Sequence, residues 1–332
     1  MNQGKAVFSA LLALLVCIVS GSAGAVGFTR LTADGPAGMA MGIWYPSDSP
    51  VPDSPNSPFR QALALDAPVA GDNHPLVVIS HGYGGWMGGH ADLALTLAES
   101  GYVVVAPEHP GNNSQDQSAV PAQWLVSRPA DIHRTLDFML QSWPDAPRID
   151  AGRIGVYGFS AGGYTALVAA GGKPDFTLAS RHCSAAPGEF LCAEGMLDAI
   201  EPVAQTARVA ELAGDSRLGA VVVAAPGLAF AFDSEGLEGI GVPVQIWSGE
   251  RDLRVPDLSN GGPLAENLPP GADLRRVANA GHFAFMVPCN PRLKEINPRI
   301  WQMVCIDNEG FDRAAFHTEL NREIRDFFDR SL

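Results

Sequence analysis

The motif Gly-Phe-Ser-Ala-Gly at residues 158–162 has the clearest chemistry in the chain. It follows a run rich in aliphatic residues, Ile154–Tyr157, that predicts a strand, and it precedes an Ala-rich stretch, 163–170, that predicts a helix. In this context G-x-S-x-G forms a tight turn that exposes the serine hydroxyl near a helix N-terminus. Side chains at the two glycine positions would collide with neighbouring backbone in so tight a turn. The motif therefore predicts Ser160 as a nucleophile.

A serine hydroxyl is a weak nucleophile and needs a base to take its proton. Among the eight histidines, His282 stands directly after the last predicted strand, Leu274–Val277, where chains of this type carry the base. His317 is the only later histidine, and it falls within a terminal amphipathic helix, where a structural or solvent-facing role is more common. We therefore predict His282 as the base.

The base needs a carboxylate that fixes its tautomer and stabilises the imidazolium. Asp252 follows the predicted strand Val244–Ser248 and gives the chain order Ser, Asp, His of α/β-hydrolases. Glu250 and Asp257 compete with it in the same loop, and Asp233 competes less strongly after the preceding strand. We predict Asp252 as the acid of the triad.

A glycine-rich segment, Ser80-His81-Gly82-Tyr83-Gly84-Gly85, follows the predicted strand Leu76–Ser80. A loop in this place supplies one backbone N–H to the oxyanion of acyl transfer, and the residue after the nucleophile supplies the other. These residues are Tyr83 and Ala161. The alternative is an ordinary glycine-rich turn. We interpret His81 as a residue that braces the loop, not as a second base.

Short apolar runs predict the framework that positions these groups. Runs rich in Val, Ile or Tyr suit strands buried on both faces of a parallel sheet, and they span Leu76–Ser80, Val103–Pro107, Ile154–Phe159, Ala220–Ala225, Val244–Ser248 and Leu274–Val277. Residues Met39–Tyr45 predict an earlier strand, and the Ser/Pro/Asp-rich stretch 47–58 predicts a surface loop.

Helical patterns lie between these strands. Apolar residues at spacings of three and four mark two helices, with Ile132, Leu136, Met139 and Trp143 on one and Phe316, Leu320, Ile324 and Phe327 on the other. Such alternation predicts an α/β fold with a doubly wound, mostly parallel sheet. Residues 172–215 break the alternation of strands and helices after the nucleophile helix, and they predict an insertion that contains a helix from Met196 to Leu212 and forms a partial lid.

The N-terminus predicts a secretory signal peptide at residues 1–25. Lys5 precedes a short apolar run, 6–19, which ends in small residues and an Ala-x-Ala sequence, with cleavage expected after Ala25. A membrane anchor is the alternative, but the run is shorter than the roughly 20 residues of a spanning helix. The mature chain, 26–332, is then a secreted or periplasmic single domain without a membrane span.

Cleavage leaves four cysteines, and an even number in a secreted chain indicates disulfides. Local pairing of Cys183 with Cys192 and of Cys289 with Cys305 closes the shortest loops and is the pairing that we predict. Buried free thiols are the alternative. A zinc site is disfavoured because no C-x-x-C or histidine pair accompanies these residues.

Composition excludes one class of partner. Among 332 residues, 36 acidic and 22 basic side chains give a net charge of −14, so the chain has no basic surface with which to neutralise nucleic-acid phosphates. Hydrophobic residues make up 46% and charged residues only 17%, which indicates a large buried core and excludes a disordered chain.

Five segments together resemble a known family: HPLVVISHGYGG, GYVVVAPEHPGN, GFSAGG, GERD and AGHFAFMVPC. They are similar to secreted bacterial α/β-hydrolases of the dienelactone-hydrolase-like group and to the platelet-activating-factor acetylhydrolase branch. The resemblance runs from about Pro75 to Phe328 and implies ester hydrolysis without a metal or organic cofactor. True dienelactone hydrolases use a cysteine where this chain has Ser160, and the acetylhydrolases carry their acid one strand earlier, where Ala225-Pro226-Gly227 offers none.

The sequence thus predicts a secreted serine carboxylesterase acting on a small-molecule or lipid-like ester. Apolar residues beside the four segments predict a pocket for the acyl or alcohol group, and they are Trp86, Phe159, Phe283, Phe285 and Met286. Within hydrolases the alternatives are a lipase or cutinase-like polyester hydrolase and an acetylhydrolase-type phospholipase. An alternative of another class is an inactive α/β-hydrolase that serves as a binding protein. The ester itself and the oligomeric state are not predicted.

Overall fold

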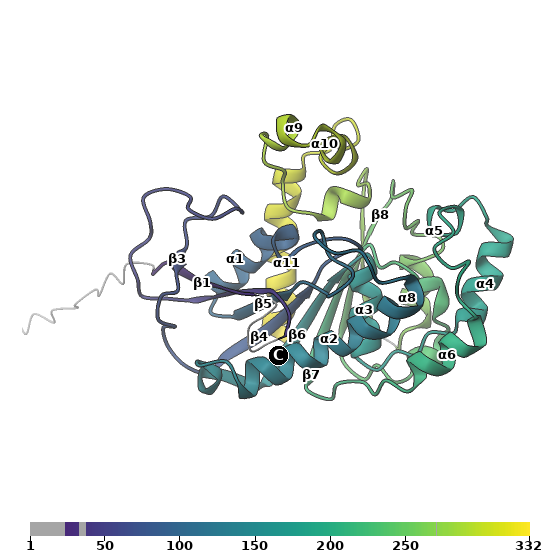
Figure 1. Cartoon of the computed structure of the whole chain (residues 1–332), viewed down its shortest axis with the longest axis horizontal. Helices are drawn as coiled ribbons and strands as arrows, with labels where there is room; N and C mark the ends of the chain where they lie inside the picture. The colour runs from purple at the N-terminus through teal and green to yellow at the C-terminus, as the bar shows by residue number, and fades with distance from the viewer. Residues whose placement is uncertain (1–23, 33–37, 270) are drawn as a thin grey trace, which may run out of the picture.

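A computed structural model describes residues 24–32, 38–269 and 271–332 (Figure 1). The predicted signal peptide, 1–25, lies outside the described residues except for its last two. The first strand, β1, begins at Val26.

One nine-stranded sheet forms the centre of the fold. Its strands are β1 (Val26–Leu31), β2 (Met41–Pro46), β3 (Ala64–Leu65), β4 (His74–Ser80), β5 (Val103–Pro107), β6 (Ile149–Phe159), β7 (Leu218–Ala224), β8 (Val244–Gly249) and β9 (Asp273–Val277). Their order is β3-β1-β2-β5-β4-β6-β7-β8-β9. Only β2 runs antiparallel to its neighbours, so the sheet is mostly parallel.

Every strand predicted from an apolar run is present, with small shifts of the ends. The central strand β4 is buried along its whole length and β7 along nearly all of it, as expected for strands covered on both faces. The sequence did not predict β1 or β3. β1 interrupts its apolar residues with Thr29 and Arg30 and lies near the sheet edge, so it carries no continuous apolar signal.

Helices cover both faces of the sheet (Figure 1). On one face α1 (Ala91–Glu99) and α11 (Arg313–Ser331) pack together against a core that includes Phe328. On the other face lie α2 (Pro121–Gln141), α3 (Ala161–Ala169) and α8 (Gly261–Asn267), whose apolar side chains join a second core. The predicted doubly wound architecture is therefore confirmed.

The segment between α3 and β7 forms α4 (Phe176–Ala185), α5 (Phe190–Ala193) and α6 (Pro202–Ala210) at one end of the sheet (Figure 1). We call residues 172–215 the insertion. The helix expected within 196–212 is present as the shorter α6. A disulfide between Cys183 and Cys192 joins α4 to α5, with the pairing expected from the sequence.

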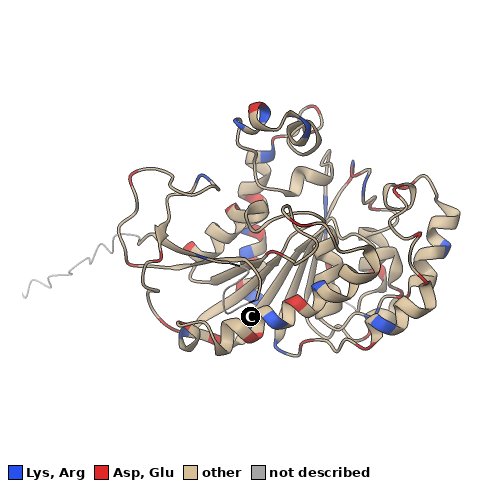
Figure 2. Cartoon of the chain, viewed as in Figure 1, with Lys and Arg blue, Asp and Glu red and all other residues tan. Residues whose placement is uncertain are grey.

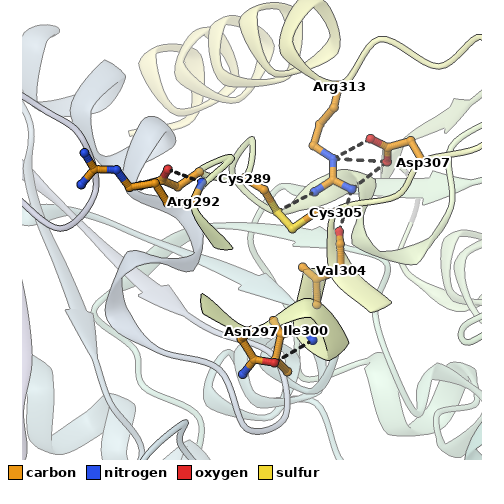
Figure 3. Close-up of a disulfide and its surroundings, with 9 residues drawn as sticks. Cys289, Arg292, Asn297, Ile300, Val304, Cys305, Asp307 and Arg313 are labelled. Atoms are coloured by element: carbon orange, nitrogen blue, oxygen red, sulfur yellow. Dashed lines mark hydrogen bonds and ion pairs between the residues drawn. A yellow bond between two sulfur atoms is a disulfide. The ribbon is translucent and has the colours of Figure 1, made fainter. Parts of the chain in front are cut away.

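A second excursion separates β9 from α11 and contains α9 (Leu293–Ile296) and α10 (Pro298–Val304). The Cys289–Cys305 disulfide closes it, again with the expected pairing (Figure 3). Arg313 fastens its end, because the guanidinium donates to Asp307 and to the Val304 carbonyl (Figure 3). The remaining short elements are α7 (Ser234–Leu237) and the 3-10 turns η1 (Met87–His90), η2 (Ala146–Arg148), η3 (Ala229–Ala231) and η4 (His282–Phe285).

Charged residues lie on the outer helices and loops, whereas the central strands contain few of them (Figure 2). Among the helices that the structure describes, none combines the length and the apolar character needed to cross a membrane.

Candidate active site

Ser160 occupies a strained turn between β6 and α3. Its backbone has φ 54° and ψ −118°, a left-handed conformation that L-residues other than glycine rarely adopt. A Cβ at Gly158 would lie 2.1 Å from the Gly162 carbonyl oxygen, and a Cβ at Gly162 would lie 2.0 Å from that of Ser80. Both glycines are thus required for the reason expected from the sequence, since the turn leaves no room for side chains.

The three candidate triad residues form one hydrogen-bonded row. The Ser160 Oγ lies 3.0 Å from His282 Nε2, and His282 Nδ1 lies 2.7 Å from Asp252 Oδ2. Asp252 is buried, and its other oxygen accepts the backbone N–H groups of Arg254 and Val255, each at 2.8 Å. An ionised Asp252 with Nδ1 protonated leaves Nε2 free to accept the serine proton, which is the arrangement that general-base catalysis needs.

The competing residues have other partners. Glu250 is exposed, Asp257 pairs with Arg276 at 2.7 Å, and Asp233 caps α7 by accepting the Gly236 N–H. His317 is buried in α11, where it contacts the Asp92 carboxylate and the Ala284 carbonyl. None of these four joins the row of Ser160, His282 and Asp252.

Two backbone N–H groups are available beside Ser160. Within the described residues, neither the Tyr83 N–H nor the Ala161 N–H donates to another group of the protein. Ala161 is the first residue of α3, so its N–H is one of the unpaired donors of that helix N-terminus. Tyr83 follows the tip of β4, where a Cβ at Gly82 would lie 3.5 Å from the Ser160 Cβ. The loop therefore approaches the nucleophile closely enough to suit an oxyanion site.

The residues predicted to line a pocket divide into two groups. The Phe159 ring packs on His282 with centroids 5.0 Å apart, and the Phe283 ring contacts it at 5.1 Å. Trp86 and Met286 are partly exposed. Phe159 and Phe285 are both buried, but Phe159 packs against His282, whereas Phe285 packs against Phe316 of α11. We therefore assign Phe285 to the core, and its predicted place in the pocket is wrong. Phe283 and Phe285 stand two positions apart on the short η4 turn, so their rings point into different surroundings.

Sequence reasoning missed two further parts of the site. Arg254 stacks over Phe190 and Phe283, 4.1 and 5.0 Å from the ring centroids, and so connects the insertion to the His282 segment. Behind the glycine-rich loop, Arg128 and His109 are completely buried. The only available signal was the position of His109 after the predicted strand Val103–Pro107, beside the strand that carries the loop.

The polar groups behind the loop have shifted pKa values. Burial, reinforced by the Arg128 cation, holds the pKa values of His81 and His109 well below the ordinary histidine range, so both are neutral at pH 7. Burial likewise raises the pKa of Asp131 to about 6. Two cavities, of about 270 and 430 Å³, lie away from Ser160: one is beside Tyr102 near the start of β4, and the other is beside the Cys183–Cys192 disulfide. The described residues contain no cluster of three potential metal ligands.

Comparison with known proteins identifies the fold. The BD-FAE family model matches residues 65–187, less than half of the chain, including Ser160 but neither Asp252 nor His282. A solved structure of ferulic acid esterase from Streptomyces cinnamoneus superposes with a TM-score of 0.62 and 21% identity, covering 93% of this chain and 90% of that one. A search of curated proteins returns no match. The chain has the α/β-hydrolase fold, and its grouping with dienelactone-hydrolase-like or acetylhydrolase-like proteins stays a prediction.

Proposed function

We propose that the chain is a secreted or periplasmic serine carboxylesterase. The observation that carries the proposal is the row of hydrogen bonds from Ser160 through His282 to Asp252, on a strained elbow beside two unpaired N–H groups. The partial match to the BD-FAE family and the likeness to a ferulic acid esterase agree with action on esters. The two disulfides agree with an oxidising compartment outside the cytoplasm.

In the proposed reaction, Ser160 Oγ attacks the ester carbonyl carbon while His282 Nε2 takes its proton. The N–H groups of Tyr83 and Ala161 stabilise the negative oxygen of the tetrahedral intermediate. His282 then protonates the departing alcohol, which leaves an acyl group on Ser160. Water, deprotonated by the same imidazole, attacks the acyl-enzyme and releases the acid, while Asp252 stabilises the imidazolium in both halves.

Esters of aromatic acids are the substrates to test first. The partly exposed Phe283 ring lies beside His282, so it offers a flat apolar surface to an aromatic acyl group, and the buried Phe159 ring packs against the imidazole. The solved relative is itself described as a ferulic acid esterase. Methyl ferulate, methyl benzoate and methyl butyrate form a panel in which an aromatic preference appears as a higher kcat/KM for the first two esters.

A polyester hydrolase is the second candidate. Leu253 and Leu258, in the loop that carries Asp252, are 84% and 92% exposed, and Tyr83 is 43% exposed. Exposed apolar side chains beside a site suit an insoluble substrate surface. Faster release of acid from a polyester suspension than from soluble esters at matched ester concentration supports this candidate, and activity on soluble esters alone excludes it.

The decisive experiment compares the mature protein with Ser160→Ala on p-nitrophenyl acetate and butyrate. The variant is expected to lose at least 10³-fold in kcat, because among the residues that the structure describes only the Ser160 hydroxyl contacts His282 Nε2. A fluorophosphonate probe should label Ser160 in the folded wild-type protein. A folded wild-type protein that is neither labelled nor active overturns the proposal and favours a binding protein, the alternative of another class.

A further inference from the structure

The buried polar cluster behind the glycine-rich loop consists of Ser80, His109, Arg128, Asp131 and Asn112. Ser80 Oγ lies 2.9 Å from His109 Nε2, and His109 Nδ1 lies 2.9 Å from Asp131 Oδ2. All five of these residues are 0% exposed. This serine, histidine and aspartate have the connectivity of a triad, but burial denies them any substrate, so the cluster needs another explanation.

Arg128 connects this cluster to the loop. Its Nη1 donates to Asn112 Oδ1 at 2.6 Å and its Nη2 donates to Ser80 Oγ at 3.3 Å. The same guanidinium reaches the backbone carbonyls of His81 and, at 3.5 Å, of Gly82. Within the described chain Arg128 forms no ion pair with a carboxylate. Burying a cation that contacts only neutral groups costs several kcal/mol, so stability does not account for an arginine here.

The Gly82 carbonyl is held from three sides. It accepts His81 Nδ1–H at 2.7 Å, the Gly85 N–H at 3.1 Å and Arg128 Nη1–H at 3.5 Å. The His109 N–H donates to His81 Nε2 at 3.3 Å, which fixes the proton of neutral His81 on Nδ1. The direction of this carbonyl is therefore set by the cluster.

The carbonyl of Gly82 and the N–H of Tyr83 belong to one peptide group. A trans peptide is planar, and its C=O and N–H point in opposite directions. Donors that draw the Gly82 oxygen into the protein therefore turn the Tyr83 N–H outward. The nearby cation also polarises the peptide, which strengthens that N–H as a donor in a site of low dielectric.

We propose that Arg128, together with His81, Ser80 and His109, positions and polarises the Gly82–Tyr83 peptide so that its N–H serves as an oxyanion donor. Arg128 is thus a positioning residue that acts on the transition state through backbone, without touching the substrate. The inference rests on the proposed esterase function, and it adds the device that keeps one half of the oxyanion site in place before substrate arrives.

The test compares Arg128→Met with Arg134→Met. Both residues lie on α2, and the Asp131 carboxylate contacts Arg134 and His109, but Arg134 is half-exposed and does not contact the loop. With p-nitrophenyl acetate, Arg128→Met should lower kcat 10- to 1000-fold, the upper end being the cost of losing one oxyanion donor, with KM within about twofold. Arg134→Met should stay within about twofold of wild type. Arg128→Lys should recover only part of the wild-type kcat, because an ammonium group cannot bridge the His81 and Gly82 carbonyls.

A transition-state analogue separates positioning from general damage. The adduct of a trifluoromethyl ketone with Ser160 carries an oxyanion, so its Ki in the Arg128 variants should rise by the factor by which kcat/KM falls. If Arg128→Met does not fold, Ser80→Ala removes a smaller part of the same cluster and should lower kcat about three- to tenfold. A folded Arg128→Met or Ser80→Ala with wild-type kcat and Ki overturns the inference.

A structural readout distinguishes this failure from failure of the esterase proposal. A crystal structure of Arg128→Met, or of Ser80→Ala, should show the Gly82–Tyr83 peptide rotated from its wild-type orientation. An unrotated peptide overturns the inference whether or not the protein hydrolyses esters. An inactive, unlabelled wild-type protein whose peptide nevertheless rotates in the variant overturns only the esterase proposal.

Discussion

The guanidinium carbon of Arg254 lies 4.1 Å from the ring centroid of Phe190, which places the loop after Asp252 directly against the insertion. Phe190 belongs to α5, and the same guanidinium lies 5.0 Å from the Phe283 ring, next to His282. One side chain therefore bridges three segments that are far apart in the sequence. The insertion borders the candidate site through this contact, and its role as a partial lid stays a prediction.

Replacing Arg254 with Ala should loosen the insertion. A cation–π contact of this partly exposed kind stabilises by about 0.5–1 kcal/mol, so amide exchange in α4 and α5 should accelerate severalfold while the core strands keep their protection. Arg251→Ala is the matched control, since Arg251 is exposed in the same loop and stacks on no ring among the described residues. Equal exchange in both variants contradicts a fastening role.

Asp252→Asn should lower kcat on p-nitrophenyl butyrate by about 10⁴-fold. An amide in place of the carboxylate that contacts His282 Nδ1 at 2.7 Å favours the wrong tautomer and cannot stabilise the imidazolium. Asp257→Asn is the control because Asp257 pairs with Arg276 instead of a histidine. The reverse ranking, with Asp257→Asn the more damaging change, would remove Asp252 from the triad.

Loss of the Cys289–Cys305 disulfide should destabilise the protein. The bridge closes a loop of 16 residues, and the double variant Cys289→Ala/Cys305→Ala should lose about 3 kcal/mol of unfolding free energy through greater freedom of the unfolded chain. The Cys183–Cys192 bridge spans 9 residues, so removing it should cost slightly less. Urea unfolding measures both losses. Dithiothreitol should lower the urea midpoint of the wild-type protein and leave that of a variant lacking all four cysteines unchanged. Equal midpoints of the wild-type protein and the Cys289→Ala/Cys305→Ala variant without reductant contradict the expectation.

Acid should destabilise the fold through buried histidines. The pKa of His90 is lowered to about 4, chiefly by burial; Asp92 opposes this shift and the neighbouring His317 reinforces it. As the pH falls below about 6.5, His90 binds a proton in the unfolded chain but stays neutral in the folded chain. The contribution of neutral His90 to the unfolding free energy is therefore fully present above pH 6.5 and is lost as the pH drops towards 4. The loss reaches about 3 kcal/mol for this residue, at about 1.36 kcal/mol per pKa unit.

His90→Gln isolates this contribution. In this variant the unfolding free energy should fall less steeply between pH 6.5 and 4 than in the wild-type protein. The difference in slope should correspond to at most one bound proton, and urea titrations at each pH measure it. Some dependence should remain because the pKa values of His81 and His109 are also well below their ordinary range. His133→Gln serves as the control, since His133 is partly exposed and pairs with Asp215 at the surface. Identical slopes in wild type and His90→Gln contradict the assignment.

The sequence predicted the parts of the fold in which one local pattern dominates. Buried parallel strands are continuous apolar runs, and the steric demands of the elbow require glycines at fixed spacing around Ser160, so the central strands and the nucleophile could be predicted directly. β1 escaped prediction because a strand near the sheet edge needs no continuous apolar run. Phe285 was misassigned because sequence proximity to His282 does not say on which side of a short turn a ring packs.

The sequence did not predict the role of Arg128, and the reason is different. It belongs to a helix whose pattern of apolar residues predicts only which face is buried, and a charged side chain on a helix is ordinarily solvated. Its contacts with Ser80 and Asn112 join residues 48 and 16 positions away, and only the packing of α2 against the ends of β4 and β5 brings them together. Long-range polar contacts of this kind have no sequence period.

The left-handed backbone of Ser160 implies that the folded state is less stable because of its own nucleophile. Ser160→Ala and Ser160→Gly both abolish the hydroxyl, but only glycine accepts φ 54° without steric conflict. The strain is of order 1–3 kcal/mol, and the extra freedom of unfolded glycine offsets about 0.5–1 of it. Ser160→Gly should therefore melt at a higher temperature than Ser160→Ala, although both are inactive. Selection of this protein for heat resistance alone would favour the loss of its proposed catalytic residue.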